Sequence, residues 1–300
     1  MAARARYQER SFRMILPGAI LLLAAVVIIL SIMVYKISHP GKVAETVNPS
    51  YYLLPSMDVH FTSIEGEPIP AWWIPGLKGA PGIILAPGYG MSRSDALSLA
   101  TLLHEAGFNL LVYEQRGCGA SPRGASTLGL QEPGDMLQAV RFMQERPESN
   151  RNRLGIWGVD VGALSALHTA AAVDEVRAIV ADSAFESPSD FLDCTIAEEF
   201  GLKNRLAQFC CHQIFKIAHL FSGASYSTRL PLDAISGRMI LFIKGDNRKG
   251  LGDLTTAIYD RIQPQKEMIS FRTSRVHLMS GDDLRSYDRQ VAGFFKMNLR

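Results

Sequence analysis

The chain has 300 residues, of which 47% are hydrophobic and 20% are charged, and this balance excludes an intrinsically disordered protein. Its net charge is +2, and four arginines less one glutamate put +3 into residues 1–13, so the rest is close to neutral and a nucleic-acid-binding body is excluded. The four cysteines show no metal-ligand spacing and are too few for a disulfide scaffold. We therefore expect no metal site and no cofactor.

The first predicted element is a membrane anchor. Residues 14–35 carry no charge, and a helix of that length spans roughly 33 Å, compared with about 30 Å for the hydrocarbon core of a bilayer. A cleaved signal peptide is the alternative, but its apolar core usually has about 7–15 residues, and no small-residue cleavage site accompanies this run. Arginines precede the run, so the positive-inside bias places residues 1–13 in the cytoplasm and the body outside, with the lipid bilayer as partner.

The sequence predicts that residues 36–56 form a linker and that residues 57–300 form one α/β domain. Alternating apolar residues at 59–63 and 69–73, on either side of a Gly-Glu-Pro turn, predict an antiparallel hairpin. Beyond the hairpin, continuous apolar runs predict strands that are buried on both faces, as in a parallel sheet. These runs are residues 82–86, 109–113, 154–157, 176–181, 239–243 and 268–271.

Segments with helical periodicity separate these strands, and the alternation predicts a mostly parallel, doubly wound sheet. The predicted helices are residues 92–106, 134–144, 161–173, 253–262 and 282–297. Residues 186–237 interrupt the alternation with two amphipathic stretches, 191–200 and 206–221. We interpret this insertion as a lid over the ends of the strands, with a plain surface excursion as the alternative.

One short motif joins a buried strand to a helix rich in small residues. Residues 158–162 read Gly-Val-Asp-Val-Gly, which is the layout of a nucleophile elbow with Asp160 at its centre. Flanking glycines allow the tight turn that presents one side chain at the end of the strand. Without other support, Asp160 would be interpreted as an ordinary helix cap.

Together with this elbow, several motifs in a fixed order resemble the α/β-hydrolase superfamily. Within it, the chain is most similar to bacterial single-pass membrane hydrolases related to serine aminopeptidase and prolyl-oligopeptidase-type domains. The resemblance covers about residues 57–295. It rests on the motifs APGYG at 86–90, YEQRGCGAS at 113–121, ADSAF at 181–185 and KGD at 244–246, and on His277 before the last helix.

The resemblance implies positions for the parts of a hydrolase site. It implies Asp160 at the nucleophile position, His277 as the base, and the backbone N–H groups of Tyr89 and Val161 as oxyanion donors. The sequence departs from the family pattern at three positions: Asp160 replaces Ser, Arg248 stands at the acid position, and Pro87 replaces His. The remaining candidates for the acid are Asp246, two residues before the expected position, and Asp182, at the end of the preceding strand.

Three functional hypotheses follow from this pattern. The first is a catalytically degenerate protein that keeps the fold for binding a small molecule or peptide at a bacterial cell membrane. The second is a hydrolase that uses Asp160 as nucleophile, as haloalkane dehalogenases and epoxide hydrolases do. The third, an ordinary ester or peptide hydrolase, lacks its serine. An elbow at Asp160 predicts a strained backbone and a carboxylate near His277. We also expect Cys210 and Cys211 to be free thiols rather than a vicinal disulfide.

Overall fold

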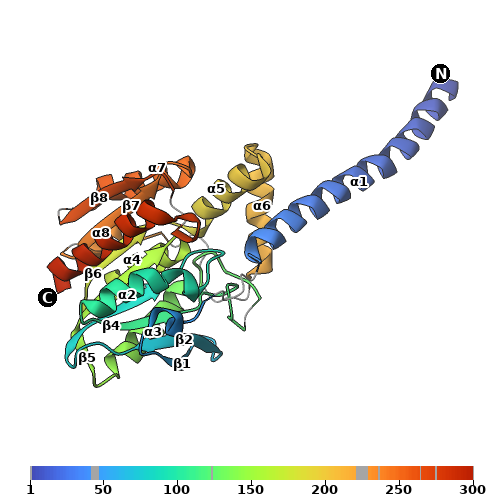
Figure 1. Cartoon of the computed structure of the whole chain (residues 1–300). Coiled ribbons are helices and arrows are strands. Elements are labelled where there is room, and N and C mark those ends of the chain that lie inside the picture. The colour runs from blue at the N-terminus through green and yellow to red at the C-terminus, as the bar shows by residue number, and fades with distance from the viewer. Residues whose placement is uncertain are drawn as a thin grey trace.

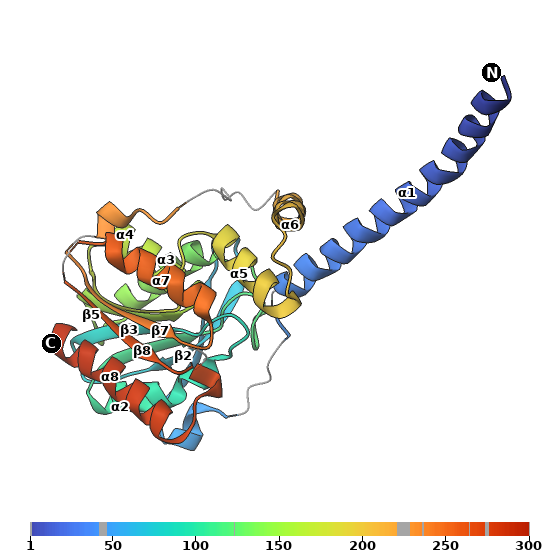
Figure 2. The ribbon, with the colours of Figure 1, turned by 90° about the horizontal axis from the view of Figure 1, so that it is seen from above.

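A computed structural model of the chain describes residues 2–41, 47–122, 124–220, 229–235, 237–263, 265–273 and 276–299. Its body is one eight-stranded sheet in the order β1-β2-β4-β3-β5-β6-β7-β8, with helices on both faces (Figures 1 and 2). The strands are β1 (Met57–Thr62), β2 (Pro68–Ile74), β3 (Ala80–Ala86), β4 (Asn109–Tyr113), β5 (Ser149–Val159), β6 (Val176–Asp182), β7 (Met239–Gly245) and β8 (Lys266–Phe271).

The helices follow the alternation that the sequence predicts. They are α1 (Ala2–Ser38), α2 (Leu97–Glu105), α3 (Glu132–Gln144), α4 (Val161–Ala172), α5 (Pro188–Phe200), α6 (Arg205–Ala218), α7 (Lys249–Arg261) and α8 (Gly281–Leu299), with short 3-10 helices η1 (Pro49–Tyr52), η2 (Arg93–Ala96), η3 (Leu232–Ile235) and η4 (Val276–Leu278). Strands β3 to β8 pair in parallel, and β1 and β2 pair in antiparallel fashion. The expected mostly parallel, doubly wound sheet is confirmed.

The predicted hairpin is also confirmed. Val59 pairs with Ala71 and Phe61 with Ile69 across β1 and β2. Antiparallel pairing continues from β2 to β4, so the hairpin forms one edge of the parallel sheet.

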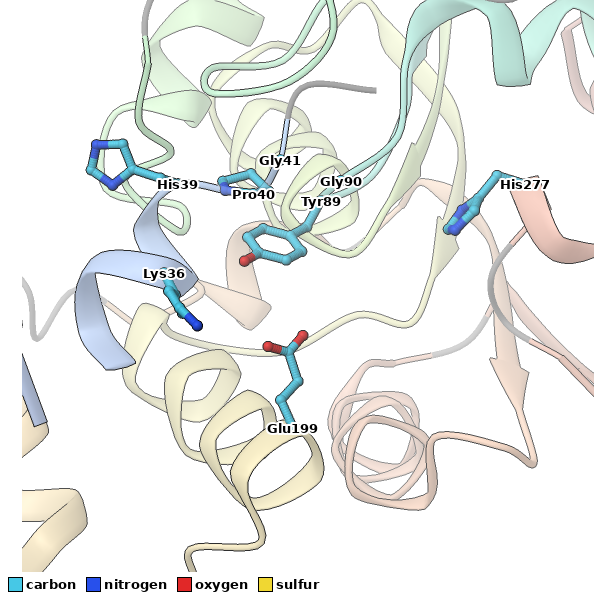
Figure 3. A pocket seen from close by; sticks show the side chains of 8 residues that line it. All are labelled: Lys36, His39, Pro40, Gly41, Tyr89, Gly90, Glu199 and His277. Carbon is cyan, nitrogen blue, oxygen red and sulfur yellow. The ribbon is translucent and has the colours of Figure 1, made fainter. Parts of the chain in front are cut away.

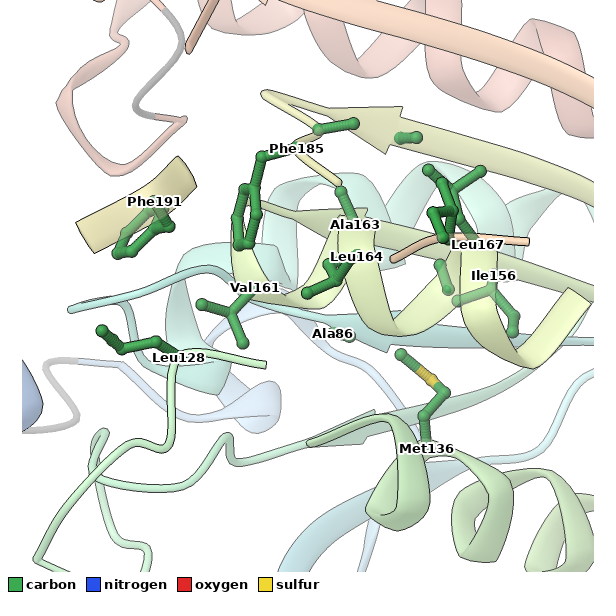
Figure 4. Packing of buried hydrophobic residues seen from close by; sticks show 14 of the residues in the cluster. Ala86, Leu128, Met136, Ile156, Val161, Ala163, Leu164, Leu167, Phe185 and Phe191 are labelled. Atoms are coloured by element: carbon green, nitrogen blue, oxygen red, sulfur yellow. The ribbon is translucent and has the colours of Figure 1, made fainter. Parts of the chain in front are cut away.

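Successive residues of the central strands supply two separate hydrophobic layers, as the pleat of a strand requires. On β3, Ile84 belongs to the layer covered by α3, α4 and α7, whereas Ile83 belongs to the layer covered by α2 and α8. Figure 4 shows the first layer, where Leu164 and Leu167 of α4 pack near Ile156 of β5. Burial on both faces explains why the central strands read as continuous apolar runs.

The insertion between β6 and β7 contains α5 and α6, so both amphipathic stretches predicted for the lid are helices. Residues 221–228 and 236 of the predicted lid, and 42–46 of the predicted linker, lie outside the described residues. Figures 1 and 2 place α6 beside the base of α1, against which it packs.

Helix α1 extends beyond the predicted exit at Lys36. Residues 16–38 form a helix of mean hydropathy 2.8, long and apolar enough to cross a membrane. Its last turns pack against the body through Leu30, Met33, Val34 and Ile37, which recur at helical spacing. Lys36 is exposed beside these buried positions, and α1 continues past it to Ser38.

Candidate functional site

The turn from β5 to α4 has the geometry of an elbow. Asp160 lies between the last residue of β5 and the first residue of α4, with φ 50° and ψ −112°. This left-handed conformation is strained for a residue with a Cβ, as the elbow interpretation predicts. The Asp160 side chain makes no capping hydrogen bond to α4, so it is not an ordinary helix cap.

The two glycines of the motif are required by close backbone contacts. A Cβ atom on Gly158 would lie 2.3 Å from the carbonyl oxygen of Gly162, and one on Gly162 would lie 2.5 Å from the carbonyl oxygen of Ala86. Both distances are shorter than any van der Waals contact. The glycines therefore let α4 begin directly against the ends of β3 and β5.

The Asp160 carboxylate is held by an arginine. Arg248 precedes α7, and its Nη1 donates to Oδ1 of Asp160 at 3.2 Å. The Nε of Arg248 donates to Oε2 of Glu198 on α5 at 2.9 Å. The side chains of Arg248 and Asp160 are only 7% and 6% exposed, whereas Glu198 is 29% exposed. The elbow thus carries a buried ion pair. Glu198 of α5 is the second partner of Arg248 and lies closer to solvent.

The electrostatic balance of this cluster keeps Arg248 charged. Burial by itself lowers the pKa of a guanidinium, but the carboxylates of Asp160 and Glu198 outweigh it and raise the pKa of Arg248. The guanidinium carbon also lies 5.8 Å from the centre of the Phe191 ring on α5. Three contacts from the elbow and the lid therefore fix one cation over the position where a nucleophile would react.

Asp182, a candidate for the acid, is engaged elsewhere. It is fully buried at the end of β6, where Ser183 Oγ donates to Oδ1 and Tyr287 Oη donates to Oδ2, each at 2.9 Å. Burial raises the pKa of Asp182 to about 8, against the lowering effect of those two hydrogen bonds. Trp157 Nε1 donates to Tyr287 Oη, so this group belongs to a chain of hydrogen bonds between the sheet and α8.

The other candidates lie near the surface. His277, in η4 after β8, lines a pocket of about 260 Å³ together with Tyr89 and Glu199, as Figure 3 shows. Lys36 and His39, from the end of α1, line the same pocket. Asp246 is exposed in the turn after β7. The structure therefore joins Asp160 with Arg248 inside the protein, and it brings Tyr89 and His277 to one pocket at the end of α1.

The two expected oxyanion positions flank the elbow. Val161 is the first residue of α4, where backbone N–H groups have no partner within the helix. Tyr89 follows the end of β3, and its ring packs edge-on against Phe191 of the lid, with ring centres 5.3 Å apart. Its hydroxyl donates to the carbonyl oxygen of Ile37 at 2.7 Å. The Tyr89 loop is thus tied both to α5 and to α1.

The YEQRGCGAS motif holds loops around the site. Arg116 is bound by Asp135, with donors from Nε and Nη2, and by Glu65 at 2.6 Å. Glu114 accepts from the backbone N–H groups of Arg93 and Ala120. These buried charges are paired, as burial requires, and they order the loops that follow β3 and β4.

Thiol and metal chemistry receive no support from the described residues. Cys118 is buried near the Tyr89 loop, and burial raises the pKa of its thiol to about 12, so the reactive thiolate is disfavoured. Cys210 and Cys211 are free thiols, as expected. Among the described residues, no group of three or more His, Cys, Asp and Glu side chains could hold a metal ion.

Two residues of the site were not predicted from the sequence. Glu198 and Phe191 lie on α5, and no motif marks them, because their role depends on how the lid packs over the elbow. Arg248 was noticed only as a missing acid. Its role becomes clear from its burial in the structure. A buried guanidinium requires a carboxylate, and Asp160 supplies one at the neighbouring strand end.

Comparison with known proteins identifies the fold. The family model described as the alpha/beta hydrolase fold matches residues 81–209, which include β3, the elbow and both lid helices up to Phe209. The esterase Pf2001 of Pyrococcus furiosus has a similar structure, with a TM-score of 0.65 and 22% identity, over 88% of this chain and 99% of that one. The structure of the alpha/beta hydrolase GrgF of Penicillium sp. sh18 is similar with a TM-score of 0.54 and 20% identity, over 82% and 99% of the two chains.

Similar sequences among curated proteins cover a smaller part of the chain. The polyketide transferase grgF of Penicillium sp. is 32% identical over 132 residues, which are 43% of this chain and 45% of that protein. The uncharacterized protein YfhR of Escherichia coli K12 is 30% identical over 136 residues, 43% of this chain and 47% of that protein. The chain thus spans less than half the length of these relatives.

Proposed function

We propose that this chain, which has the α/β-hydrolase fold, keeps that fold as a membrane-anchored binding protein without hydrolytic activity. The observation that carries this proposal is the buried hydrogen bond from Arg248 to Asp160 at the elbow. An ion pair occupies the position at which a hydrolase of this fold presents its nucleophile.

The ion pair opposes nucleophilic attack by Asp160. A carboxylate nucleophile must direct an oxygen lone pair at the substrate carbon and lose its negative charge as the ester forms. Attack would therefore neutralise the carboxylate that pairs with Arg248 at the elbow and leave this buried cation with Glu198 alone, and breaking a buried pair costs about 3–5 kcal/mol. Even about 3 kcal/mol, added to the activation free energy, slows the reaction roughly a hundredfold.

Two of the positions expected to supply the acid for the second half of a hydrolytic cycle are occupied in another way. A histidine base needs a carboxylate that orients it and stabilises the imidazolium. Both oxygens of Asp182 accept from Ser183 and Tyr287, and a carboxyl group with a pKa of about 8 is mostly neutral at pH 7. Arg248 stands where the resemblance expects the acid. These features support a site that holds a ligand and does not turn it over.

Membrane anchoring is supported by α1. Residues 16–38 have the length and hydropathy of a membrane span, and residues 16–29 are exposed in the structure. An exposed apolar helix of this length is unstable in water, and a bilayer covers it. We place the N-terminus in the cytoplasm and the body on the outer side of a bacterial cell membrane, because arginines precede the helix.

The proposal is tested on the full-length chain in detergent micelles. The chain is incubated with p-nitrophenyl butyrate, an acyl thioester and a bromoalkane, and the matched control is Asp160→Asn. We expect both proteins to give the same background rate and neither to react with a fluorophosphonate. Turnover of the bromoalkane that Asp160→Asn abolishes would establish the Asp-nucleophile hydrolase instead. Ester or thioester turnover with fluorophosphonate labelling would reveal a serine hydrolase. Either result overturns the proposal.

A further inference from the structure

The base of α1 is fixed to the site. Besides the packing of Leu30 and Val34, the backbone carbonyl of Ile37 accepts from Tyr89 Oη at 2.7 Å, and that of Ser38 accepts from the N–H of Ser126 at 2.7 Å. The helix therefore leaves the body as a rigid rod rather than on a flexible tether (Figure 1).

The part of α1 that leaves the body is too short to span a bilayer alone. The charge-free run begins at Met14, and Leu30 is the first buried residue among those from 16 onward whose side chains are described, which leaves the 16 residues from 14 to 29. At about 1.5 Å per residue they cover roughly 24 Å, compared with a hydrocarbon core of about 30 Å. If α1 spans the bilayer, roughly 6 Å of hydrocarbon must lie against the body around residues 30–33.

The surface of the body at that level is apolar. Helix α6, which packs against α1, exposes Leu206, Phe209 and Ile217 along one face, and Leu220 follows just after its end. Arg205 and Lys216 are exposed on the same helix. An amphipathic helix with this pattern lies in a membrane interface with its apolar face about 5–10 Å deep. That depth agrees with the shortfall in the length of α1.

A groove opens at the same level, between α1 and the end of α5. It has a volume of about 480 Å³, within the range of ligand pockets, and its lining is mostly apolar. The lining residues are Ile29, Leu30, Ile32, Met33, Lys36, Phe200 and Leu202. Since residues 30–33 lie at the depth of hydrocarbon, the molecules beside this groove are the acyl chains of the bilayer.

The groove and the pocket of the site share one lining residue. Lys36 lines both the groove and the pocket that contains Tyr89 and His277. Figure 3 shows Lys36 and Glu199 directed toward each other from α1 and α5, below Tyr89. A cation and an anion across one small pocket match a head group that carries both a phosphate and an amine.

We propose that this groove binds one acyl chain of a zwitterionic bilayer phospholipid, with its phosphate at Lys36 and its amine at Glu199. This inference rests on the membrane anchoring in the proposed function and names the ligand of the same site. The lipid reaches the groove by lateral diffusion in the bilayer, because the residues of α1 that line it between positions 29 and 33 lie at the depth of hydrocarbon.

The test uses the full-length chain in vesicles that contain phosphatidylethanolamine with a photoreactive acyl chain. We expect cross-links concentrated at Phe200 and Leu202. The variant Ile32→Trp fills the groove and should reduce these cross-links roughly tenfold, because the acyl chain loses its buried apolar contacts. The matched control Ile28→Trp, on an exposed part of α1 outside the groove lining, should leave them unchanged. Lys36→Gln should weaken cross-linking when the photoreactive lipid is limiting.

Three results would overturn the lipid site. They are cross-links spread evenly along residues 20–28, cross-links insensitive to Ile32→Trp, and stronger labelling by phosphatidylglycerol or a free fatty acid than by phosphatidylethanolamine. Two further readouts separate this inference from its premises. Release of the chain from vesicles by alkaline carbonate would contradict the anchoring, and a labelled lipid recovered without its acyl chain would contradict the absence of hydrolysis while leaving the groove assignment intact.

Discussion

Arg248 and Asp160 form a buried ion pair that joins the two positions at which the chain departs most from a serine hydrolase. In the sequence, the loss of the nucleophile at position 160 and the loss of the acid at position 248 look independent. In the structure they are one feature, because each residue supplies the charge that the other requires. Replacing Arg248 alone therefore leaves the Asp160 carboxylate without this cation in the protein interior, whereas replacing Asp160 alone leaves Arg248 with Glu198.

Loss of the cation from the Arg248–Asp160 pair should destabilise the fold. Arg248→Leu leaves Asp160 buried without its cation, and we expect the free energy of unfolding to fall by about 3–5 kcal/mol. The measurement is urea unfolding followed by tryptophan fluorescence. Adding Asp160→Asn should restore most of the loss, because no charge then remains buried.

A surface ion pair provides the control for this measurement. Arg285 is bound to Asp282, and both side chains are exposed. Arg285→Ala should change the free energy of unfolding by less than about 1 kcal/mol. Equal effects of Arg285→Ala and Arg248→Leu would show that the elbow pair is no stronger than a surface pair.

Esterase activity should require two changes at the elbow. Asp160→Ser alone supplies a nucleophile but leaves Arg248 at the acid position, so we expect hydrolysis of p-nitrophenyl butyrate near background. Asp160→Ser combined with Arg248→Asp supplies both, and we expect at least roughly tenfold more activity, since the orienting carboxylate contributes up to about 10⁴ in a complete triad. Strong activity in Asp160→Ser alone would show that Asp182 or Asp246 already serves as the acid.

Asp182 should make stability depend on pH. Its pKa rises from an ordinary value of 3.8 to about 8 on folding, chiefly through burial, so the folded state binds a proton that the unfolded state releases. Its favourable contribution is full below pH of about 4 and is lost as the pH rises toward about 8, with a slope of up to about 1.4 kcal/mol per pH unit.

Asp182→Asn isolates this contribution. The amide cannot titrate, so the free energy of unfolding should depend less on pH between 5 and 7.5 than in the original chain. The difference between the two proteins removes the effect of His168 and His219, whose pKa values are lowered by burial. Parallel pH profiles for the two proteins would mean that Asp182 is ionised throughout this range.

The glycines offer a matched test of the elbow. Gly162→Ala forces a Cβ to within 2.5 Å of the Ala86 carbonyl, and we expect a loss of about 1–3 kcal/mol or more in the free energy of unfolding. Gly293→Ala, within α8, meets no atom within 4 Å and should raise it by about 0.5–1 kcal/mol. If both substitutions have the same sign, the close contact at Gly162 is relieved by movement of α4.

The fold was predictable where burial alone decides the structure. The run at 109–113 coincides with β4, because burial on both faces makes residues 110–113 continuously apolar after the buried Asn109. Strand β5 begins at Ser149, five residues before the predicted run, since its first residues are polar and pair with Ala80 and Pro81 through the backbone. Backbone pairing at the edge of an apolar run leaves no pattern in side chains.

The site was predictable in part. Spacing of glycines identified the elbow and the strain at Asp160, because both follow from local backbone geometry. The partners of Asp160 depend on which strand ends lie side by side and on how α5 covers them. Glu198 could not be found in this way, since adjacent Glu198 and Glu199 are equivalent in sequence, and only packing directs one to Arg248 and the other to the Tyr89 pocket.

The hydrogen bond between Tyr89 and Ile37 gives α1 a mechanical role if this helix spans a membrane, as we propose. A transmembrane helix adapts to a thinner or thicker bilayer by changing its tilt. Because the base of α1 is fastened to the loop after β3 and to Ser126, it cannot tilt independently of the body. If α1 spans a bilayer, as we propose, the thickness of that bilayer sets the angle at which the whole domain stands on it, and strain from a mismatch reaches the attachments at Tyr89 and Ser126.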